Sequence, residues 1–385
     1  MDHDLRKTSL KKPTTDKNRL AHTSPNPEIV DIAGASMRSK TLPPPPEWAI
    51  QQALGLESIQ VSWLAGDGSD RCYYRLHDQV NSKTFVLMQL SGDDAVMLAK
   101  DGYEWVKISA LLNDHRISAP KTIAALPDFA ALIIDDYGDI MMETFAIEAL
   151  VKNQRTEVLQ LYQQAFHMLR KFLEIKESGQ SHWRDRSFDA ARFEWELHFY
   201  REQFLEAVLE WKFSPTEAHA FHRDAKALAQ WLADRSHYFV HRDFHSRNVM
   251  VKDQKLAVID FQDARLGPPT YDLVSLCFDS YIPLTGHERR ELVENGIQIL
   301  ASTERSLTVE QLEAEIGPML LQRQLKAIGS FGYLTVKKNR GNYLRNIAPA
   351  LATLDADLIE DERWPFLSRT MMQELKNRWQ ERGAE

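Results

Sequence analysis

The sequence predicts an α+β fold of two lobes, with a β-rich N-terminal lobe and a mostly helical C-terminal lobe. Three observations lead to this. Up to about residue 140, apolar residues alternate or form short runs that turns containing glycine separate, as in β-strands. Beyond that point they recur at spacings of three and four, as in amphipathic helices. A short apolar run, a polar loop and a hairpin interrupt the helical part at Tyr238–Asp263.

The composition is that of an ordinary globular protein. Of the 385 residues, 43% are apolar and 26% are charged, which is enough for the cores of two lobes. The net charge of −8 argues against sequence-independent binding of nucleic acid, which requires a basic surface. The chain has two cysteines and no apolar run of membrane-spanning length. We therefore expect a cytoplasmic protein without a disulfide framework and without a membrane partner.

Residues 1–45 are expected to form a flexible, proline-rich tail. They are polar and end in Pro43–Pro46, and such a composition buries too little apolar surface to offset the entropy of ordering. A proline run favours an extended, stiff spacer. We favour a passive extension over the alternative, a docking peptide for a partner.

The predicted N-terminal lobe, residues 46–140, begins with a short helix from Trp48 and two strands, Ser58–Leu64 and Cys72–Leu76. The turn between these strands is rich in glycine, so its backbone N–H groups can approach phosphate oxygens, although the same residues also make an ordinary hairpin turn. The candidate phosphate-binding residues of this turn are Gly66, Gly68, Ser69 and Arg71.

A third strand at Thr84–Leu90, a helix at Ala95–Asn113 and an apolar strand at Phe129–Ile134 complete this lobe. The last strand runs into an acidic connector with a glycine, which suits a hinge between two lobes. A nucleotide base would lie against this connector, and its candidate residues are Asp135 and Tyr137.

The predicted C-terminal lobe, residues 141–385, is mostly helical. Apolar residues from Leu159 to Leu173 lie on one helix face, and a second helix spans Phe188–Leu209. A third begins at Ser214, where Ser-Pro-Thr-Glu forms a capping box with proline at the first helical position. Further helices are expected around 320–335 and 343–354.

The stretch Tyr238–Asp263 carries the chemistry. It contains His241-Arg242-Asp243, then Asn248, and then Asp260 after a hairpin of two apolar runs. Phosphoryl transfer from ATP needs a carboxylate that accepts the proton of the acceptor hydroxyl, and oxygen ligands that hold Mg²⁺ on the phosphates. In this pattern the first aspartate is the base, and the asparagine and the second aspartate hold the metal. We therefore predict Asp243 as the catalytic base, Asn248 and Asp260 as Mg²⁺ ligands, and ATP as co-substrate.

Two other interpretations of this stretch are weaker. It could be a polar surface loop that a buried His241 supports, since motif matches carry false positives. His241, Asp243 and His245 could instead bind a transition metal, but zinc prefers three or four His or Cys ligands, and no further partners are evident nearby.

One position departs from the kinase pattern. Kinases usually place a phosphate-pairing lysine on the third strand, where this chain has Met88 and Gln89. Either another cation covers the phosphates or the activity is reduced. The candidate cations are Arg71, Arg75 and Lys83. Glu104 matches the glutamate that pairs with the missing lysine, but a solvated helix face explains it better.

The run from His241 to Leu276 resembles the aminoglycoside phosphotransferase branch of the kinase-like fold, and it is most similar to the bacterial anomeric kinases of amino sugars. The resemblance covers about residues 50–360. It implies transfer, dependent on ATP and Mg²⁺, to the C1 hydroxyl of N-acetylmuramate or N-acetylglucosamine in cell-wall sugar recycling. Two departures concern substrate choice: the proline-rich tail, and Gln89-Leu90-Ser91-Gly92 where the family has a turn like Asp-Ala-Pro-Pro.

Four side chains are candidates for substrate binding, each with a structural role as the alternative. They are Glu196, His245, Arg247 and Arg265. Arg265 lies close to the metal carboxylates in sequence and could clamp a phosphate or an anionic substrate, or form a salt bridge to Asp263. Asp272 is expected to cap a helix or to pin the catalytic loop. Two other functions stay open: a non-catalytic nucleotide- or sugar-binding regulator, and a kinase of aminoglycosides or another small alcohol.

Overall fold

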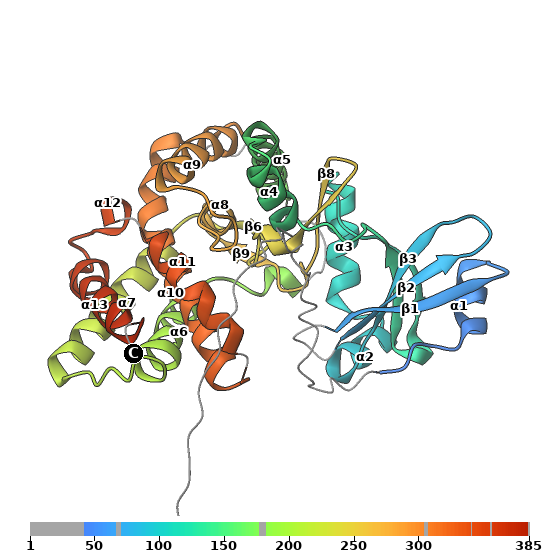
Figure 1. Ribbon diagram of the computed structural model, residues 1–385, viewed down its shortest axis with the longest axis horizontal. Helices are drawn as coiled ribbons and strands as arrows, with labels where there is room; N and C mark the ends of the chain where they lie inside the picture. The colour runs from blue at the N-terminus through green and yellow to red at the C-terminus, as the bar shows by residue number, and fades with distance from the viewer. Residues whose placement is uncertain are drawn as a thin grey trace, which may run out of the picture. The chain divides into compact units, whose positions relative to one another are not determined.

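The computed structural model describes residues 42–385 except 67–70, 177–181, 304–306, 340, 355 and 384–385. The predicted tail therefore lies almost wholly outside the described residues, and so do Gly68 and Ser69. Contacts group Lys40–Glu385 into one compact unit. Within it, an antiparallel sheet precedes a mostly helical region, which confirms the predicted α+β fold (Figure 1).

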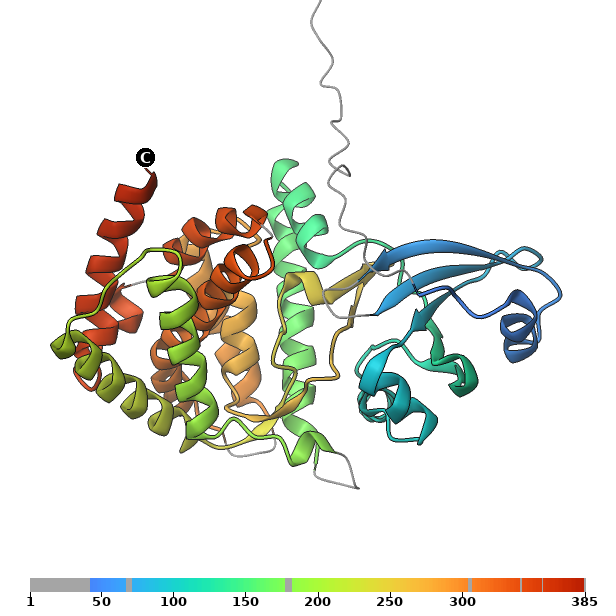
Figure 2. The same ribbon diagram turned by 90° about the horizontal axis from the view of Figure 1, so that it is seen from below.

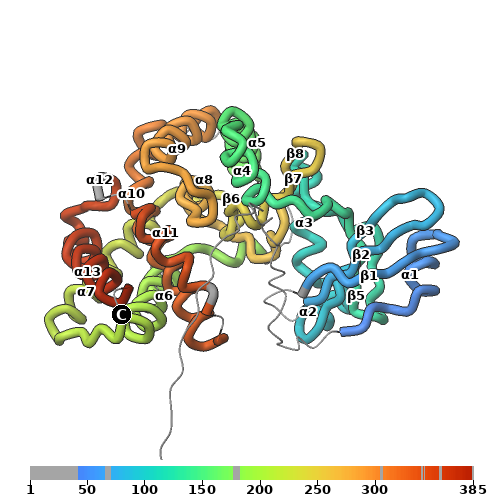
Figure 3. The backbone as a smooth tube through the Cα atoms, viewed as in Figure 1, coloured from blue at the N-terminus to red at the C-terminus, as the bar shows by residue number. Residues whose placement is uncertain are grey.

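The sheet has five antiparallel strands in the order β1-β2-β3-β5-β4 (Figures 1 and 3). In β2 every second side chain is buried, and Cys72, Tyr74 and Leu76 pack in a small core beneath helix α1 (Glu47–Leu54). The strand bounds are β1 Ile59–Gly66, β2 Cys72–Asp78, β3 Thr84–Gln89, β4 Thr122–Leu126 and β5 Ala131–Asp135.

The single helix predicted at Ala95–Asn113 is wrong, because two helices occupy this region. They are α2 (Gly92–Ala99) and α3 (Glu104–Asp114). The chain turns between them at Asp101, whose φ of 55° is left-handed, and at Gly102, where a Cβ would lie 2.9 Å from the side chain of Met97.

The rest of the unit is helical apart from two small two-stranded sheets, β6–β9 and β7–β8. The helices are α4 Met142–Val151, α5 Arg155–Glu174, α6 Ala190–Tyr200, α7 Pro215–Ala233, α8 Tyr271–Cys277, α9 Gly286–Ala301, α10 Val309–Val336, α11 Ile347–Ala352, α12 Ala356–Ile359 and α13 Met371–Gly383. The strands are β6 Tyr238–Val240, β7 Val249–Lys252, β8 Lys255–Val258 and β9 Arg265–Gly267. Short helical turns are η1 Pro127–Phe129, η2 His182–Arg184, η3 Arg201–Glu206, η4 Ser246–Asn248, η5 Gly341–Asn346 and η6 Phe366–Thr370.

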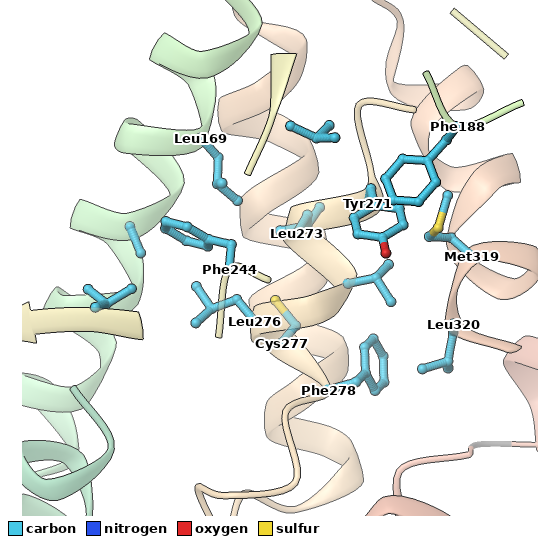
Figure 4. Close-up of a cluster of buried hydrophobic side chains, with 14 of the residues drawn as sticks. Leu169, Phe188, Phe244, Tyr271, Leu273, Leu276, Cys277, Phe278, Met319 and Leu320 are labelled. Carbon is cyan, nitrogen blue, oxygen red and sulfur yellow. The ribbon is translucent and has the colours of Figure 1, made fainter. Parts of the chain in front are cut away.

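Helix α8 lies at the centre of the main hydrophobic core (Figure 4). All seven of its residues are buried, with Leu169 of α5 on one side and Met319 and Leu320 of α10 on the other. Phe244, from the loop after β6, also enters this cluster and is fully buried. The loop is therefore anchored in the core of the helical region.

The β7–β8 hairpin (yellow in Figure 2) connects the helical region to the sheet region. Its backbone N–H groups at Val251 and Val258 donate to the carbonyl oxygens of Ile140 and Ser118, both at 2.8 Å. The Lys252 ammonium donates to the Asp136 carbonyl, also at 2.8 Å. These bonds fix the hairpin against the segment that leaves the sheet.

Helix α10 is largely buried and approaches its neighbours closely at glycines. A Cβ at Gly329 would lie 2.7 Å from the Cα of Tyr200 in α6, and one at Gly332 would lie 2.4 Å from the carbonyl oxygen of Gln203 in η3. Among the described residues, no helix is long and apolar enough to cross a membrane.

Candidate active site

Two buried carboxylates hold the polar loop between β6 and β7. Asp272 in α8 accepts hydrogen bonds from the backbone N–H groups of His241 (2.6 Å) and Arg242 (3.0 Å). Asp279, just after α8, accepts from the backbone N–H of Ser246 at 2.9 Å and from its hydroxyl. Burial raises the pKa of Asp272 to about 6. Of the two interpretations of Asp272, the contacts support the loop anchor.

The loop and the hairpin bring Asp243, Asn248 and Asp260 together. The Asn248 amide donates to the backbone carbonyl of Asp243 at 2.9 Å and to the Asp260 carboxylate at 3.4 Å. Asp260 has a φ of 62°, a left-handed conformation, directly after the hairpin. The Gln262 side chain donates to its other carboxylate oxygen at 2.7 Å.

The donor set at Asn248 and Asp260 fits Mg²⁺. Both residues line one cavity, and no described residue donates a hydrogen bond to the amide oxygen of Asn248. A carboxylate and an amide oxygen are hard ligands of the kind that Mg²⁺ takes with phosphates and water. His241 does not fit a transition-metal site, because it is fully buried and both ring nitrogens already have hydrogen-bond partners.

Asp243 forms an ion pair with a lysine that lies far along the chain. The Lys326 ammonium of α10 is 3.0 Å from the Asp243 carboxylate, and the Arg242 guanidinium is 3.9 Å from its other oxygen. Burial on its own would raise the pKa of Asp243, but the charges of Lys326 and Arg242 outweigh it and hold this pKa well below its ordinary value. Asp243 is therefore an ionised hydrogen-bond acceptor at neutral pH.

A cavity of about 490 Å³ lies beside Asn248 and Asp260, within the range of small-molecule sites. Apolar side chains of the sheet and of α3 line one side of it. These include Leu64, Val86, Met88, Trp105 and Ile134. Polar groups of the loop and the hairpin line the other side. Among the described lining residues the only cation is Arg247, which forms two hydrogen bonds to Glu143 at 2.8 and 2.6 Å.

Cations outnumber carboxylates on the other side of Asp243. The cation cluster consists of Arg192, Arg242, Arg265, Arg323 and Lys326, and its carboxylates are Asp243, Glu196, Asp263 and Asp272. Arg242 pairs with Asp263 at 3.0 Å, and Arg192 with Glu196 at 3.3 Å.

Arg265 differs from the other members of the cation cluster. It is 8% exposed and stacks over the Phe188 ring, with its Nε donating to the backbone carbonyl of Asp263 at 3.3 Å. No described carboxylate pairs with it. Burial lowers the pKa of Arg265, and the positive charges of Arg242 and Arg192 lower it further. A buried guanidinium among like charges favours an anionic ligand.

Comparison with known proteins identifies the family. A sequence profile of the phosphotransferase enzyme family matches residues 61–305, more than half of the chain. The chain belongs to this family. It is therefore an enzyme, a phosphotransferase with a small-molecule hydroxyl group as acceptor, as its sequence predicts.

Individual relatives agree with this assignment. The N-acetylmuramate/N-acetylglucosamine kinase of Pseudomonas aeruginosa is 25% identical over 291 residues, which are 74% of this chain and 79% of that protein. The Plasmodium vivax ethanolamine kinase matches with a TM-score of 0.54 at 13% identity, over 78% of this chain and 84% of that one. An aminoglycoside phosphotransferase with bound ADP matches with a TM-score of 0.55 at 14% identity, over 84% and 98%. These structures confirm the kinase-like fold.

The predicted nucleotide residues of the phosphotransferase lie in different surroundings. Asp135 and Tyr137 line the cavity, and Gly66 ends β1, while Gly68 and Ser69 lie outside the described residues. Each of the three candidate cations has a partner: Arg71 pairs with Asp94 at 2.9 Å, Arg75 pairs at 2.8 Å each with Asp136 and Asp139, which line the cavity, and Lys83 lies over the Phe85 ring. The solvated helix face expected for Glu104 is wrong: both of its carboxylate oxygens are buried, with no hydrogen-bond partner among the described residues.

The predicted acceptor residues of the phosphotransferase divide into two groups. Glu196 and Arg265 lie in the cation cluster, where Glu196 is 1% exposed and accepts from Gln322 at 2.7 Å. His245 and Arg247 lie on the cavity side, near Asn248 and Tyr281. The alternative role of Arg265, a salt bridge to the Asp263 carboxylate, is absent in the described region, where Arg242 and Arg186 pair with that carboxylate.

Sequence reasoning missed Lys326 and Arg323 as functional candidates. Both lie in α10. Lys326, which pairs with Asp243, is 83 residues beyond it in the sequence, so no local motif contains Lys326 or Arg323. A signal was nevertheless present. The apolar run that ends at Leu321 passes into Gln322-Arg323-Gln324 and Lys326, and polar residues inside a buried helix need partners.

Proposed function

We propose that this phosphotransferase uses ATP and Mg²⁺ to phosphorylate the anomeric C1 hydroxyl of an N-acetylated amino sugar, either N-acetylmuramate or N-acetylglucosamine. The observation that carries the proposal is that Asn248 and Asp260 line one cavity and that the Asn248 amide also bonds to the backbone carbonyl of Asp243. The name of the Pseudomonas aeruginosa relative supports the acceptor. Such an enzyme would act in the cytoplasm in cell-wall sugar recycling.

In this proposal Asp243 orients the sugar hydroxyl and takes its proton late in the transfer. A bond forms between the C1 oxygen and the γ-phosphorus of ATP, the bond from that phosphorus to the β,γ-bridging oxygen breaks, and ADP leaves. Asn248 and Asp260 would hold Mg²⁺, and the bound ion would neutralise charge on the phosphates. Because Lys326 keeps Asp243 ionised, the carboxylate can accept the hydroxyl hydrogen bond at neutral pH.

We propose that residues 46–140 bind the nucleotide and that residues 141–385 supply the catalytic loop and the acceptor site. The adenine would occupy the apolar side of the cavity, near Asp135 and Tyr137. The phosphates would then lie toward Asp260 and the turn after Gly66. Arg71 directly follows that turn, so it is our candidate for the cation that replaces the kinase lysine.

The cation cluster favours N-acetylmuramate over N-acetylglucosamine, because only the former carries a carboxylate. Arg265 has no carboxylate partner among the described residues and lies next to Arg242, which reaches Asp243. A carboxylate on the sugar would complete a charge-assisted hydrogen bond there, whereas a cationic aminoglycoside would meet like charge.

The experiment is a product assay with ATP and both sugars, with and without Mg²⁺, read by mass spectrometry. The full chain should form a sugar 1-phosphate and ADP only with Mg²⁺. Asp243→Asn should lower turnover by about 10³-fold or more while ATP binds within a few-fold, because the lost interaction acts on the transferring proton.

Near-normal turnover by Asp243→Asn would exclude Asp243 as the base. Absence of any sugar phosphate from the full chain, with ATP still bound, would exclude an anomeric kinase and favour a regulator that binds nucleotide.

A further inference from the structure

Three side chains with metal-binding chemistry meet on the helical region, separate from the site described above. Glu194 and His198 are one turn apart on α6, and His222 comes from the neighbouring helix α7. Each turns one donor atom toward the other two. None of these residues belongs to the catalytic loop or to the cation cluster.

The donor atoms have the spacing of metal ligands. His222 Nδ1 lies 3.4 Å from His198 Nε2 and 3.4 Å from Glu194 Oε1, and His198 Nε2 lies 3.8 Å from the same oxygen. A circle through three points with these separations has a radius of about 2.1 Å, which agrees with Zn–N distances of about 2.0–2.1 Å and Zn–O distances of about 2.0–2.2 Å.

The donor types select the ion. Two imidazoles and one carboxylate suit zinc, whereas Mg²⁺ takes oxygen ligands in an octahedron. His222 is 56% exposed, so water can reach a fourth position, while Glu194 and His198 are about two-thirds to three-quarters covered. The alternative is a hydrogen-bonded cluster in which the two rings and the carboxylate share protons.

We propose that Glu194, His198 and His222 bind one zinc ion that ties α6 to α7. Helix α6 also carries Arg192 and Glu196, which belong to the acceptor side of the active site. A zinc link therefore fixes the helix from which these two side chains project, and it stabilises the folded chain whether or not substrate is bound.

The test measures zinc binding by calorimetry on the full chain after treatment with chelator. Millimolar Mg²⁺ is present throughout, so that the carboxylates of the active site are occupied. One equivalent of Zn²⁺ should bind with micromolar or tighter affinity. His222→Gln and His198→Gln should each weaken it at least about tenfold, since loss of even an outer-shell contact has this effect. His219→Gln is the matched control, an exposed histidine on the same helix outside the cluster.

Co²⁺ gives a second, spectroscopic readout that reports the geometry around the bound ion. Bound at these residues, it should show the visible absorption of a four-coordinate ion in the full chain and in His219→Gln but not in His222→Gln. Absence of zinc binding by the full chain would overturn the proposal. So would equal zinc binding by His222→Gln and the full chain, or equal loss in the His219→Gln control.

Discussion

At the scale of single residues, the ion pair between Lys326 and Asp243 decides the charge state of the proposed base. The two charged atoms are 3.0 Å apart and both side chains are largely covered, so solvent screens their interaction weakly. In the proposed mechanism the lysine therefore acts on the chemistry through the charge of Asp243.

Lys326→Met should move the acidic limb of the profile of kcat/KM against pH to higher pH. Burial raises the pKa of Asp243 and the lysine charge lowers it, so removing the charge lets this pKa rise and the carboxylate protonate earlier as pH falls. Lys326→Arg should keep most of the original profile. A purely structural role would lower kcat in Lys326→Met and leave the acidic limb where it was.

Arg265→Gln should change acceptor choice more than overall activity. We expect kcat/KM for N-acetylmuramate to fall by about 10- to 150-fold, the effect of about 1.5–3 kcal/mol for a hydrogen bond to a charged group, with N-acetylglucosamine within a few-fold. Arg369→Gln, on a C-terminal residue that pairs with Glu360 and Glu362, is the control. An equal fall for both sugars would mean that Arg265 serves the transferred phosphoryl group instead.

Asp243, Asn248 and Asp260 could be singled out from the sequence because one short stretch contains all of them at characteristic spacings. The partners of Asp243 could not be predicted, because Lys326 comes near Asp243 only when α8 and α10 pack together. That Arg265 has no carboxylate partner among the described residues could not be predicted either. It depends on Arg242 taking the Asp263 carboxylate, which is a choice between neighbours that tertiary structure makes.

At the scale of elements, α10 depends on glycines where it crosses α6 and η3. Ordinary helix propensity would favour alanine there by about 1 kcal/mol. At Gly332 an alanine does not fit, because its Cβ would meet the Gln203 carbonyl and the Phe204 backbone. These backbone atoms cannot move aside as a flexible side chain can.

Gly332→Ala should lower the free energy of unfolding by about 1–3 kcal/mol despite the better helix propensity, because overpacking costs more. Urea denaturation followed by circular dichroism measures this. Gly286→Ala, at the exposed start of α9 with nothing within 4 Å of the added Cβ, is the matched control and should leave the free energy of unfolding unchanged or slightly raised. A stabilised Gly332→Ala chain would show that α10 can shift away from η3.

Elements with local signals could be predicted, and those without could not. The capping box at Ser214 and Glu217 places the start of α7 where the sequence predicts it. Strand β4, at Thr122–Leu126, was missed because its alanines have little strand preference and pairing with β5 decides its conformation. The division between α2 and α3 depends on the left-handed Asp101, which apolar periodicity does not reveal.

At the scale of the whole molecule, the arrangement in two lobes could be predicted because the change from strand to helix periodicity is a property of the entire chain. The way in which the β7–β8 hairpin joins the two regions could not be predicted. Its bonds to Ser118, Ile140 and Asp136 link residues more than a hundred positions apart.

That hairpin has a consequence for how such chains can be recombined. Asp260 follows β8, in which the Val258 N–H donates to the Ser118 carbonyl. The two halves of the chain are therefore joined by backbone hydrogen bonds at specific positions. A chimaera that joined the first half of this chain to the second half of a distant relative would have to reproduce these backbone hydrogen bonds in order to fold. With the proposed acceptor site, replacing side chains on α6, α10 and β9 should therefore change acceptor preference more readily than swapping lobes between such enzymes.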